Sequence, residues 1–280
     1  MTTDVAGAKA FYSEVIGWGA RDASTADLAY TLLTSVDIEI GGVMGLPEEA
    51  TKKGARPRWM GYVGVDNVAV VADQIKRLGG KIYVPPTETN IGRISVVADL
   101  EMAALGLIDE VQPRRNDPGD LDQPGRVGWH ELLAGDPNKA FAFYQELFGW
   151  QNADSETGVT DSYRLFSAGG EAIGGMLAKR KREPFSSWLY YFNVDDIDEA
   201  TQRVKDTGGR IFGGPIEVPG DRWVARCVDP QGATFALQGA RSRPRYAQGP
   251  GTQLSWSASW GGVSSRGRVI VNDGKGPSSK

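Results

Sequence analysis

The side chains in this sequence that could carry acid–base or metal chemistry are few, and the two most informative are neighbours. His130 is the only histidine of the 280 residues, and Glu131 follows it in the apolar run from Gly128 to Leu133. A carboxylate in apolar surroundings can act as a general base. Alternatively, Glu131 forms a structural ion pair with Arg222 or accepts hydrogen bonds from backbone amides. We expect His130 to pack beside a helix with its ring hydrogen-bonded.

Motifs that would define a reaction are missing from the sequence. HExxH, CxxC and GxSxG do not occur, and the Gly-Gly pairs at Gly41 and Gly174 lie in neither GxGxxG nor GxxxxGK[ST]. The single Cys227 sits in the apolar run WVARCV, which favours a packed thiol over a reactive one. The groups left to consider are carboxylates, phenols and guanidinium groups.

A duplicated stretch indicates how these groups are positioned. The segment Ala8 to Trp18, AKAFYSEVIGW, returns as Ala140 to Trp150, AFAFYQELFGW. The apolar residues of each copy recur at i, i+3, i+4, i+7 and i+8, which predicts a helix with one buried face. Asp4 and Asp136 fit the N-cap positions, and the glycine that closes each copy fits a left-handed C-terminal position.

The duplication extends over most of the chain. Equivalent residues lie 132, 133 and 129 positions apart for Asp4 and Asp136, Tyr30 and Tyr163, and Trp59 and Trp188. This ordered agreement predicts two homologous domains, at residues 1–114 and 126–240, joined by a breaker-rich linker at 115–125. Residues 241–280 are rich in Gly, Ser, Pro and Arg, so we expect a mostly disordered tail.

Hydrophobic patterning predicts the order of elements in each domain. In the second domain, a strand at 128–133 precedes the duplicated helix, and strands at 162–168 and 171–177 form a hairpin. A strand at 188–194 leads into a second helix capped by Asp195. Three more strands complete the domain, at 210–216, 223–228 and 234–237. The predicted order is therefore β-α-β-β-β, twice per domain.

The first domain repeats this order, with its second helix at 68–78, except at its start. Met1 aligns with Leu133, so no residues match the opening strand. Three explanations are open: the chain is truncated, its start is placed too late, or another segment fills the gap. The tail, with Trp256 and Trp260, is one candidate for such a segment.

These features together resemble the vicinal oxygen chelate superfamily, which includes glyoxalase I, bleomycin-resistance proteins and extradiol dioxygenases. The shared features are the paired β-α-β-β-β order, the FYxxxFGW-like helices, the V-D-D cap, the Gly-Gly after the second helix and the D-P-x-G turn. The resemblance implies an α+β fold of two tandem domains. It implies that each domain pairs two β-α-β-β-β modules into a cup-shaped mixed sheet, with helices outside and a small-molecule site inside.

The resemblance also raises the question of a catalytic metal. Superfamily enzymes typically chelate a divalent ion through His, Gln or Glu on the first, fifth and eighth strands of a domain. Aligned by the flanking motifs, these slots hold Trp129, Leu189 and Ala236 in the second domain, and an absent residue, Met60 and Gly106 in the first. Apart from Met, a weak ligand, none of these can bind a metal through its side chain. We therefore expect no metal and no other cofactor, with His130 a ligand only if the strand register is shifted by one residue.

The cup that the resemblance implies would have an apolar floor with a few polar groups. Strand alternation places Glu131 in it as the candidate catalytic residue. The residues expected to contact a ligand are Trp129, Tyr163, Tyr191, Asn193, Arg222, Tyr30, Tyr62 and Arg93. Such a floor suits a planar or aromatic molecule. The tyrosines could equally serve the core, and the arginines could hold a carboxylate of the fold.

Composition limits the partners and the compartment. The net charge is −4 and no long basic block occurs, so nucleic acid is not an expected partner. No segment has the pattern of a signal peptide or the length of a membrane span, so we expect a cytoplasmic protein without a membrane partner. A small molecule is the expected partner, bound by a monomer or a homodimer.

Three functions are compatible with this sequence. The leading one is metal-independent binding of a small, planar or apolar molecule, as in a sequestering protein of the bleomycin-resistance type. The second is an enzyme, such as a lyase, isomerase, hydroxylase or dioxygenase, that uses Glu131 and tyrosines or an undetected metal. The third is a scaffold for protein interactions, which cups closed by their own side chains would favour.

Overall fold

A computed structural model describes residues 1–26, 28–36, 38–89, 91–109, 122–153, 163–180 and 185–242. All of them belong to one compact unit, Met1–Tyr246. Most of the expected linker at 115–125 and the tail beyond residue 242 lie outside the described residues. None of the helices in the described ranges has the length and apolar character needed to cross a bilayer.

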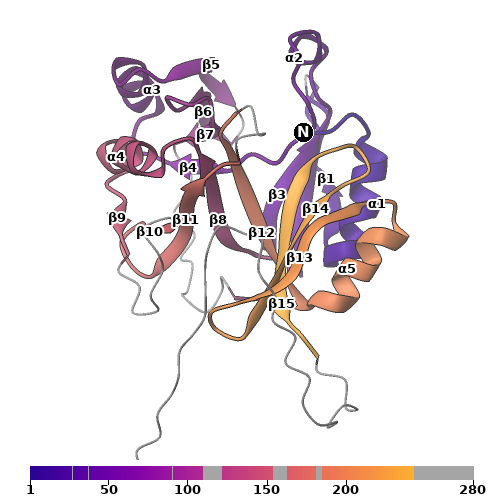
Figure 1. Cartoon of the computed structure of the whole chain (residues 1–280). Coiled ribbons are helices and arrows are strands. Elements are labelled where there is room, and N and C mark those ends of the chain that lie inside the picture. The colour runs from indigo at the N-terminus through magenta and orange to yellow at the C-terminus, as the bar shows by residue number, and fades with distance from the viewer. Residues whose placement is uncertain are drawn as a thin grey trace, which may run out of the picture. The chain divides into compact units, whose positions relative to one another are not determined.

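The second half of the chain forms an eight-stranded mixed sheet with two helices (Figure 1). Its elements are β8 (Val127–Ala134), α4 (Pro137–Phe148), β9 (Gln151–Asn152), β10 (Tyr163–Ser167), β11 (Ala172–Ala178), β12 (Ser187–Asp196), α5 (Ile197–Asp206), β13 (Arg210–Val218), β14 (Arg222–Val228) and β15 (Thr234–Ala240). The strand order is β13-β14-β15-β12-β8-β11-β10-β9. In chain order, β8-α4-β9-β10-β11 is followed by β12-α5-β13-β14-β15, and the short β9 is a strand that patterning did not predict.

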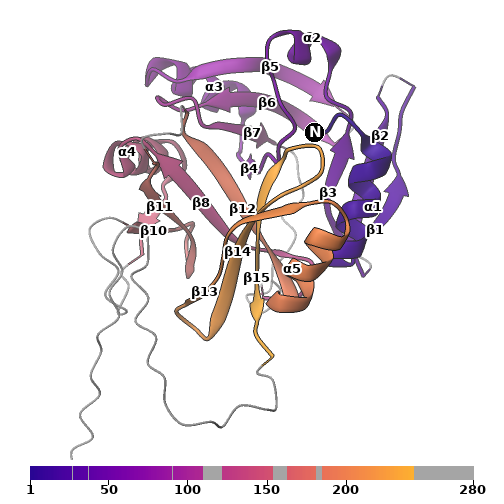
Figure 2. The same ribbon diagram turned by 45° about the vertical axis from the view of Figure 1, so that its right-hand side comes forward.

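The first half forms two smaller sheets. Its elements are α1 (Val5–Ile16), β1 (Gly19–Asp22), β2 (Tyr30–Ser35), β3 (Ile38–Met44), α2 (Glu48–Lys52), β4 (Tyr62–Gly64), α3 (Val68–Arg77), β5 (Lys81–Thr89), β6 (Gly92–Ala98) and β7 (Ala104–Ile108). One sheet has the order β1-β2-β3 and the other β4-β7-β6-β5. Figure 2 shows β4 to β7 beside α3, and β1 to β3 beside α1.

The two sheets of the first half are separated at the place that β8 occupies in the second half. In the second half, β8 pairs in parallel with β11 and antiparallel with β12, so it joins the two modules into one sheet. In the first half, no strand of the described residues lies between β3 and β4. At the position that corresponds to the end of β8, Thr2 forms a parallel bridge to Gly45. The bridge corresponds to the last β8–β11 pair, Ala134 with Ala178, as the alignment of Met1 with Leu133 requires.

Capping side chains set where the duplicated helices begin and end. The carboxylates of Asp4 and Asp136 accept hydrogen bonds from backbone N–H groups of the first turns of α1 and α4. Gly17 and Gly149 close these helices at φ values of 87° and 68°, which glycine adopts without strain. The expected cap of α5 was wrong by one position: Asp196, and not Asp195, accepts from the N–H groups of the first turn. The strand β12 extends to Asp196, which leaves Asp195 within it.

Helices from the two halves pack against each other. Helix α1 contacts α5, and α3 contacts α4, as Figure 1 shows on its two sides. Two hydrogen bonds repeat this relation. The Tyr12 hydroxyl donates to Asp229 Oδ2 at 3.0 Å, and the Tyr144 hydroxyl donates to Asp99 Oδ2 at 3.0 Å. Each duplicated helix therefore binds a turn of the other half of the chain.

Candidate functional site

The three expected metal-slot positions of the second half share one face of the large sheet. Tyr191 of β12 pairs with Trp129 of β8 on one side and with Ala236 of β15 on the other. Side chains of directly paired residues point to the same face. Leu189 lies two residues from Tyr191 and joins the same buried cluster, with Trp129 and Ala236. The face that these residues share, called the cup face below, is apolar where superfamily enzymes carry ligating groups.

Glu131 lies on the cup face and forms a buried ion pair. Its Oε2 accepts from Nη2 of Arg226, and the two residues are only 5% and 6% exposed. The Tyr191 hydroxyl donates to the same oxygen at 2.9 Å. Burial first, and then the negative charge of Glu131, raise the pKa of Tyr191, so its hydroxyl stays protonated. The carboxylate is thus neutralised and hydrogen-bonded within the fold.

The partner of Glu131 differs from the one expected. Arg222 pairs instead with Asp122, at 2.6 Å, near the exposed end of β14. Sequence reasoning missed Arg226, although a signal was present. An arginine inside the apolar run WVARCV must leave the core or find a buried anion. Because Arg226 pairs with Ala236 across the sheet, it lies on the face that holds Glu131.

Two further polar pairs lie on or beside the cup face. Trp129 Nε1 donates to the Tyr163 hydroxyl at 2.9 Å, and both side chains are partly exposed. Burial of the phenol and the nearby charge of Glu131 raise the pKa of Tyr163. Asn193 Oδ1 accepts from Gln238 Nε2 at 2.6 Å, with both residues buried. The polar side chains on the floor of the cup face are therefore bonded to one another, while Trp129 and Tyr163 form a partly exposed rim.

The expected ligand-contacting residues of the first half lie apart from this network. The ring of Tyr30 covers Gly42, and that of Tyr62 covers Gly106. Tyr163 covers Gly175 in the same way, so Tyr30 and Tyr163 hold equivalent places. Arg93 forms an ion pair with Glu88 of the neighbouring strand.

The residues present do not fit the divalent metal that the superfamily implies. Trp129, Leu189 and Ala236 offer no donor atoms on their side chains for a hard or borderline ion. The nearby carboxylate of Glu131 is held by a guanidinium group. At Gly106, an added Cβ would lie 2.3 Å from the Tyr62 ring, so a ligating side chain has no room there. Among the described residues, no three His, Cys, Asp or Glu side chains gather in a way that could hold an ion.

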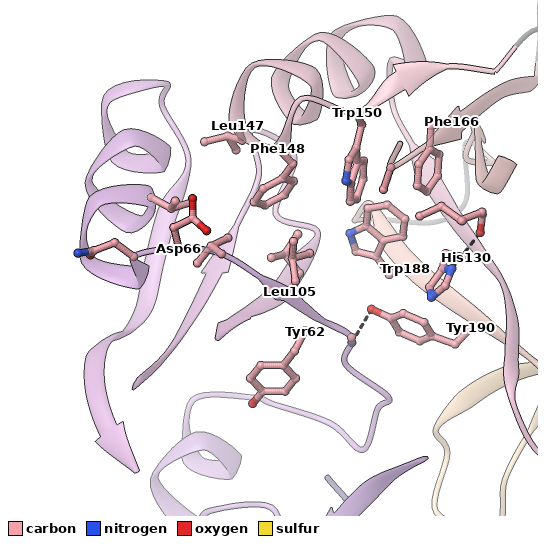
Figure 3. A pocket seen from close by; sticks show the side chains of 18 of the residues that line it. Tyr62, Asp66, Leu105, His130, Leu147, Phe148, Trp150, Phe166, Trp188 and Tyr190 are labelled. Carbon is pink, nitrogen blue, oxygen red and sulfur yellow. Dashed lines mark hydrogen bonds between the residues drawn. The ribbon is translucent and has the colours of Figure 1, made fainter. Parts of the chain in front are cut away.

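His130 lies on the opposite face of β8 from Glu131, toward the helices. Its Nδ1 lies 2.9 Å from the carbonyl oxygen of Ile173, and its ring meets that of Tyr190 edge-on, with 5.9 Å between centroids. Burial lowers the pKa of His130, which keeps the ring neutral near pH 7. Beside it lies a cavity of about 670 Å³, between β4 and α3 on one side and β8 and α4 on the other (Figure 3).

Comparison with known proteins places this geometry in a family. Residues 126–237 match the model of the Glyoxalase/Bleomycin resistance protein/Dioxygenase superfamily. A protein of Mycobacterium bovis named "Putative glyoxylase CFP32" is 31% identical over 240 residues, which cover 84% of this chain and 90% of that protein. The "Anthracycline biosynthesis protein DnrV" of Streptomyces peucetius is 26% identical over 251 residues, covering 84% of this chain and 88% of the relative.

Solved structures share the fold at low sequence identity. The Mn(II)-bound glyoxalase from Novosphingobium aromaticivorans has a TM-score of 0.58 at 14% identity, over 86% of this chain and 80% of that one. The 2,2',3-trihydroxybiphenyl 1,2-dioxygenase from Sphingomonas wittichii has a TM-score of 0.56 at 13% identity, over 84% of this chain and 86% of that one. The mixed α+β architecture is therefore shared with both.

Proposed function

Because the chain belongs to the glyoxalase/bleomycin resistance protein/dioxygenase superfamily, we propose that it binds a small, planar or apolar molecule without a catalytic metal. In this proposal, the chain is a tandem of two domains, each built from paired β-α-β-β-β modules. One observation carries it: the three slots for metal ligands on the cup face hold Trp129, Leu189 and Ala236, and these pack together in one apolar cluster.

The rim of the cup face suits a flat, partly anionic molecule. Trp129 and Tyr163 present partly exposed aromatic surface, and Ile216 and Val218 of β13 pack into the same cluster. Arg222, at the start of β14, adds a guanidinium group, with about a third of its side chain exposed. Aromatic surface with a few polar groups is the usual lining of a small-molecule site. Two relatives are named for anthracycline biosynthesis, and anthracyclines are flat, fused-ring molecules.

Metal analysis and ligand binding test this proposal together. We expect protein purified without chelator to hold less than one divalent ion per chain, and we expect anthraquinone-2-sulfonate to bind equally well with and without EDTA. Trp129→Ala should weaken this binding about tenfold, since an aromatic contact of about 1 kcal/mol or more is lost. Exposed Tyr83→Phe serves as the control. A stoichiometric, tightly held metal would overturn the proposal.

An enzyme is the second candidate, and one observation favours it. Glu131 is a buried carboxylate hydrogen-bonded to a phenol that stays protonated, a pair that can move a proton between two oxygens. If the protein is an enzyme of this kind, Glu131→Gln should abolish turnover of a substrate while circular dichroism still shows a folded chain, although loss of the ion pair lowers its stability. Unchanged turnover in that variant would remove the candidate.

A further inference from the structure

The cavity beside His130 lies on the helix side of β8, away from the cup face. Its wall includes the aromatic side chains of Phe148, Trp150, Phe166 and Trp188, together with aliphatic side chains of β4, α3 and β7 (Figure 3). Its volume, about 670 Å³, falls in the range of small-molecule sites, about 300–1,000 Å³. It is therefore large enough for a ligand of two or three fused rings.

The duplication shows why this space is open. Tyr191 pairs with Ala236 and Tyr62 with Gly106, so the next residues, Phe192 and Val63, are equivalent. By the same strand registers, Phe235 of β15 corresponds to Leu105 of β7.

In the contact between α1 and the second half, the two phenylalanines fill the interior. The ring of Phe192 lies 4.8 Å from that of Trp18 and 5.1 Å from that of Trp59, between centroids. Both Phe192 and Phe235 are at most 1% exposed. In the other contact, the smaller Val63 and Leu105 line the cavity. The interior is therefore filled where these two positions hold phenylalanine, and open where they hold valine and leucine.

Two polar groups in the cavity wall have bonding capacity to spare. The carbonyl oxygen of Ile173 only accepts, so His130 Nδ1 carries the hydrogen and Nε2 of the neutral ring is an acceptor. Within the described residues, Nε2 has no hydrogen-bond partner. The Tyr190 hydroxyl accepts from the Gly61 N–H at 2.6 Å, which leaves its own hydrogen to donate. A ligand with a hydroxyl group would satisfy the histidine.

We propose that this cavity binds a planar phenol of two or three fused rings, with its rings against Trp188 and Phe148 and its hydroxyl donating to His130 Nε2. The site is separate from the one in the proposed function, because Glu131 and His130 point to opposite faces of β8. The proposal for this cavity would stand even if nothing binds at the cup face.

The single histidine allows a direct test on the unmodified chain. In protein without a histidine tag, the one imidazole can be followed by ¹H–¹⁵N NMR during titration with 2-naphthol and with naphthalene. We expect 2-naphthol to shift the His130 Nε2 signal saturably and to bind about threefold to tenfold tighter than naphthalene, the effect of one net hydrogen bond. If the Nε2 signal stays unmoved at saturating 2-naphthol, the proposal is wrong, and the cup-face proposal is untouched.

A filling variant tests the location. Val63→Phe with Leu105→Phe copies the filled interior of the other contact and should weaken 2-naphthol binding at least about tenfold. The matched control is Val84→Phe with Leu100→Phe, which makes the same changes at side chains 38% and 48% exposed. Equal binding by the filling variant and the control would overturn the proposal. If the filling variant does not fold, the histidine titration of the unmodified chain decides.

Discussion

The buried ion pair is the most consequential feature at the scale of single residues. Removing one partner of such a pair leaves a charge without compensation inside the protein. We therefore expect Arg226→Met to lower the free energy of unfolding by about 3–5 kcal/mol, measured by urea denaturation. Arg222→Met removes a pair exposed to solvent and should cost at most about 1 kcal/mol. Similar losses in the two variants would show that Glu131 is not buried as described.

His130 gives the stability a pH dependence whose direction follows from its burial. Its pKa is lowered in the folded protein, while in the unfolded chain it lies near the ordinary value of about 6.5. The groups packed against the ring are Tyr190 and the Ile173 carbonyl, neither of which is charged. The unfolded chain therefore binds the extra proton, and stability present above about pH 6.5 is lost as the pH falls toward the lowered value.

His130→Phe isolates this contribution. The difference in unfolding free energy between the unmodified chain and the variant should be largest near pH 8 and shrink toward pH 5, as measured by urea denaturation at each pH. A difference that stays constant over this range would contradict a lowered pKa of His130 in the folded protein.

At the scale of elements, the start of α5 distinguishes two adjacent aspartates. Asp196 accepts from the N–H groups of Asp198 and Glu199, whereas Asp195 is exposed. Partial burial pushes the pKa of Asp196 upward, but hydrogen bonds from Ser242 and from the first turn outweigh it and lower the pKa to about 2. Its stabilising effect is therefore present above about pH 4 and lost as the pH falls toward 2.

Alanine substitutions compare the two positions directly. Asp196→Ala should lower the free energy of unfolding by about 1–2 kcal/mol at pH 7, the usual effect of losing an N-cap. Asp195→Ala should change it by at most about 0.5 kcal/mol, as for an ordinary exposed position. Thermal unfolding measures both variants. A larger loss of stability for Asp195→Ala than for Asp196→Ala would show that Asp195 is the N-cap, as the sequence predicted.

Local patterns explain which elements were predictable. The helices α1 and α4 follow from apolar spacing, a capping aspartate and a closing glycine, all of which act within a few residues. Strand alternation places Trp129 with Glu131 and Ala236 with Gln238, whereas the resemblance to the superfamily implied that both sets face the cup. The error at Asp195 arose because two adjacent aspartates can both cap a helix, and only the length of β12 decides between them.

Contacts between distant segments were not predictable from one sequence. The pairing of Glu131 with Arg226 spans 95 residues, and the bond from Tyr12 to Asp229 spans 217. The apolar run WVARCV shows that Arg226 needs a buried anion but not which one, and the bond from Tyr12 leaves no local pattern. The cavity beside His130 likewise depends on which residues of one half meet those of the other. Its signal, Val63 and Leu105 in place of two phenylalanines, becomes readable only once the strand registers are known.

At the scale of the whole molecule, the bonds from Tyr12 to Asp229 and from Tyr144 to Asp99 tie the halves together, and each tyrosine also accepts a bond from a tryptophan of its own half. Trp59 Nε1 donates to the Tyr12 hydroxyl at 2.7 Å, and Trp188 Nε1 donates to that of Tyr144 at 3.3 Å. Tyr12→Phe removes the hydroxyl that bonds Asp229 Oδ2 and Trp59 Nε1, so we expect a loss of about 1–3 kcal/mol in urea denaturation. Tyr144→Phe should cost a similar amount. Tyr83→Phe, at a residue 48% exposed, is the control, and equal losses in all three variants would contradict the role of these bonds.

The gap between the two sheets of the first half predicts that an added strand would stabilise the protein. Met1 and Thr2 already bond to both sides of the gap, because Thr2 N–H donates to Met44 and the Arg58 N–H donates to the Met1 carbonyl. A strand entering at Met1 would thus run between β3 and β4 as β8 runs between β11 and β12. Placing the sequence VGWHEL of β8 before Met1 should raise the unfolding free energy by about 1–2 kcal/mol, through new cross-strand pairs.

A Gly-Ser extension of equal length is the control, since it adds the same chain without side chains to pack. The β8 copy should raise the melting temperature by about 2–8 °C relative to that control, given the size of the described unit. Because the strand would close the edges of β3 and β4, their amide protons should also exchange more slowly with solvent. If both extensions give the same melting temperature and the same exchange rates, these edges cannot accept a strand, and the two modules of the first half are stable as separate sheets.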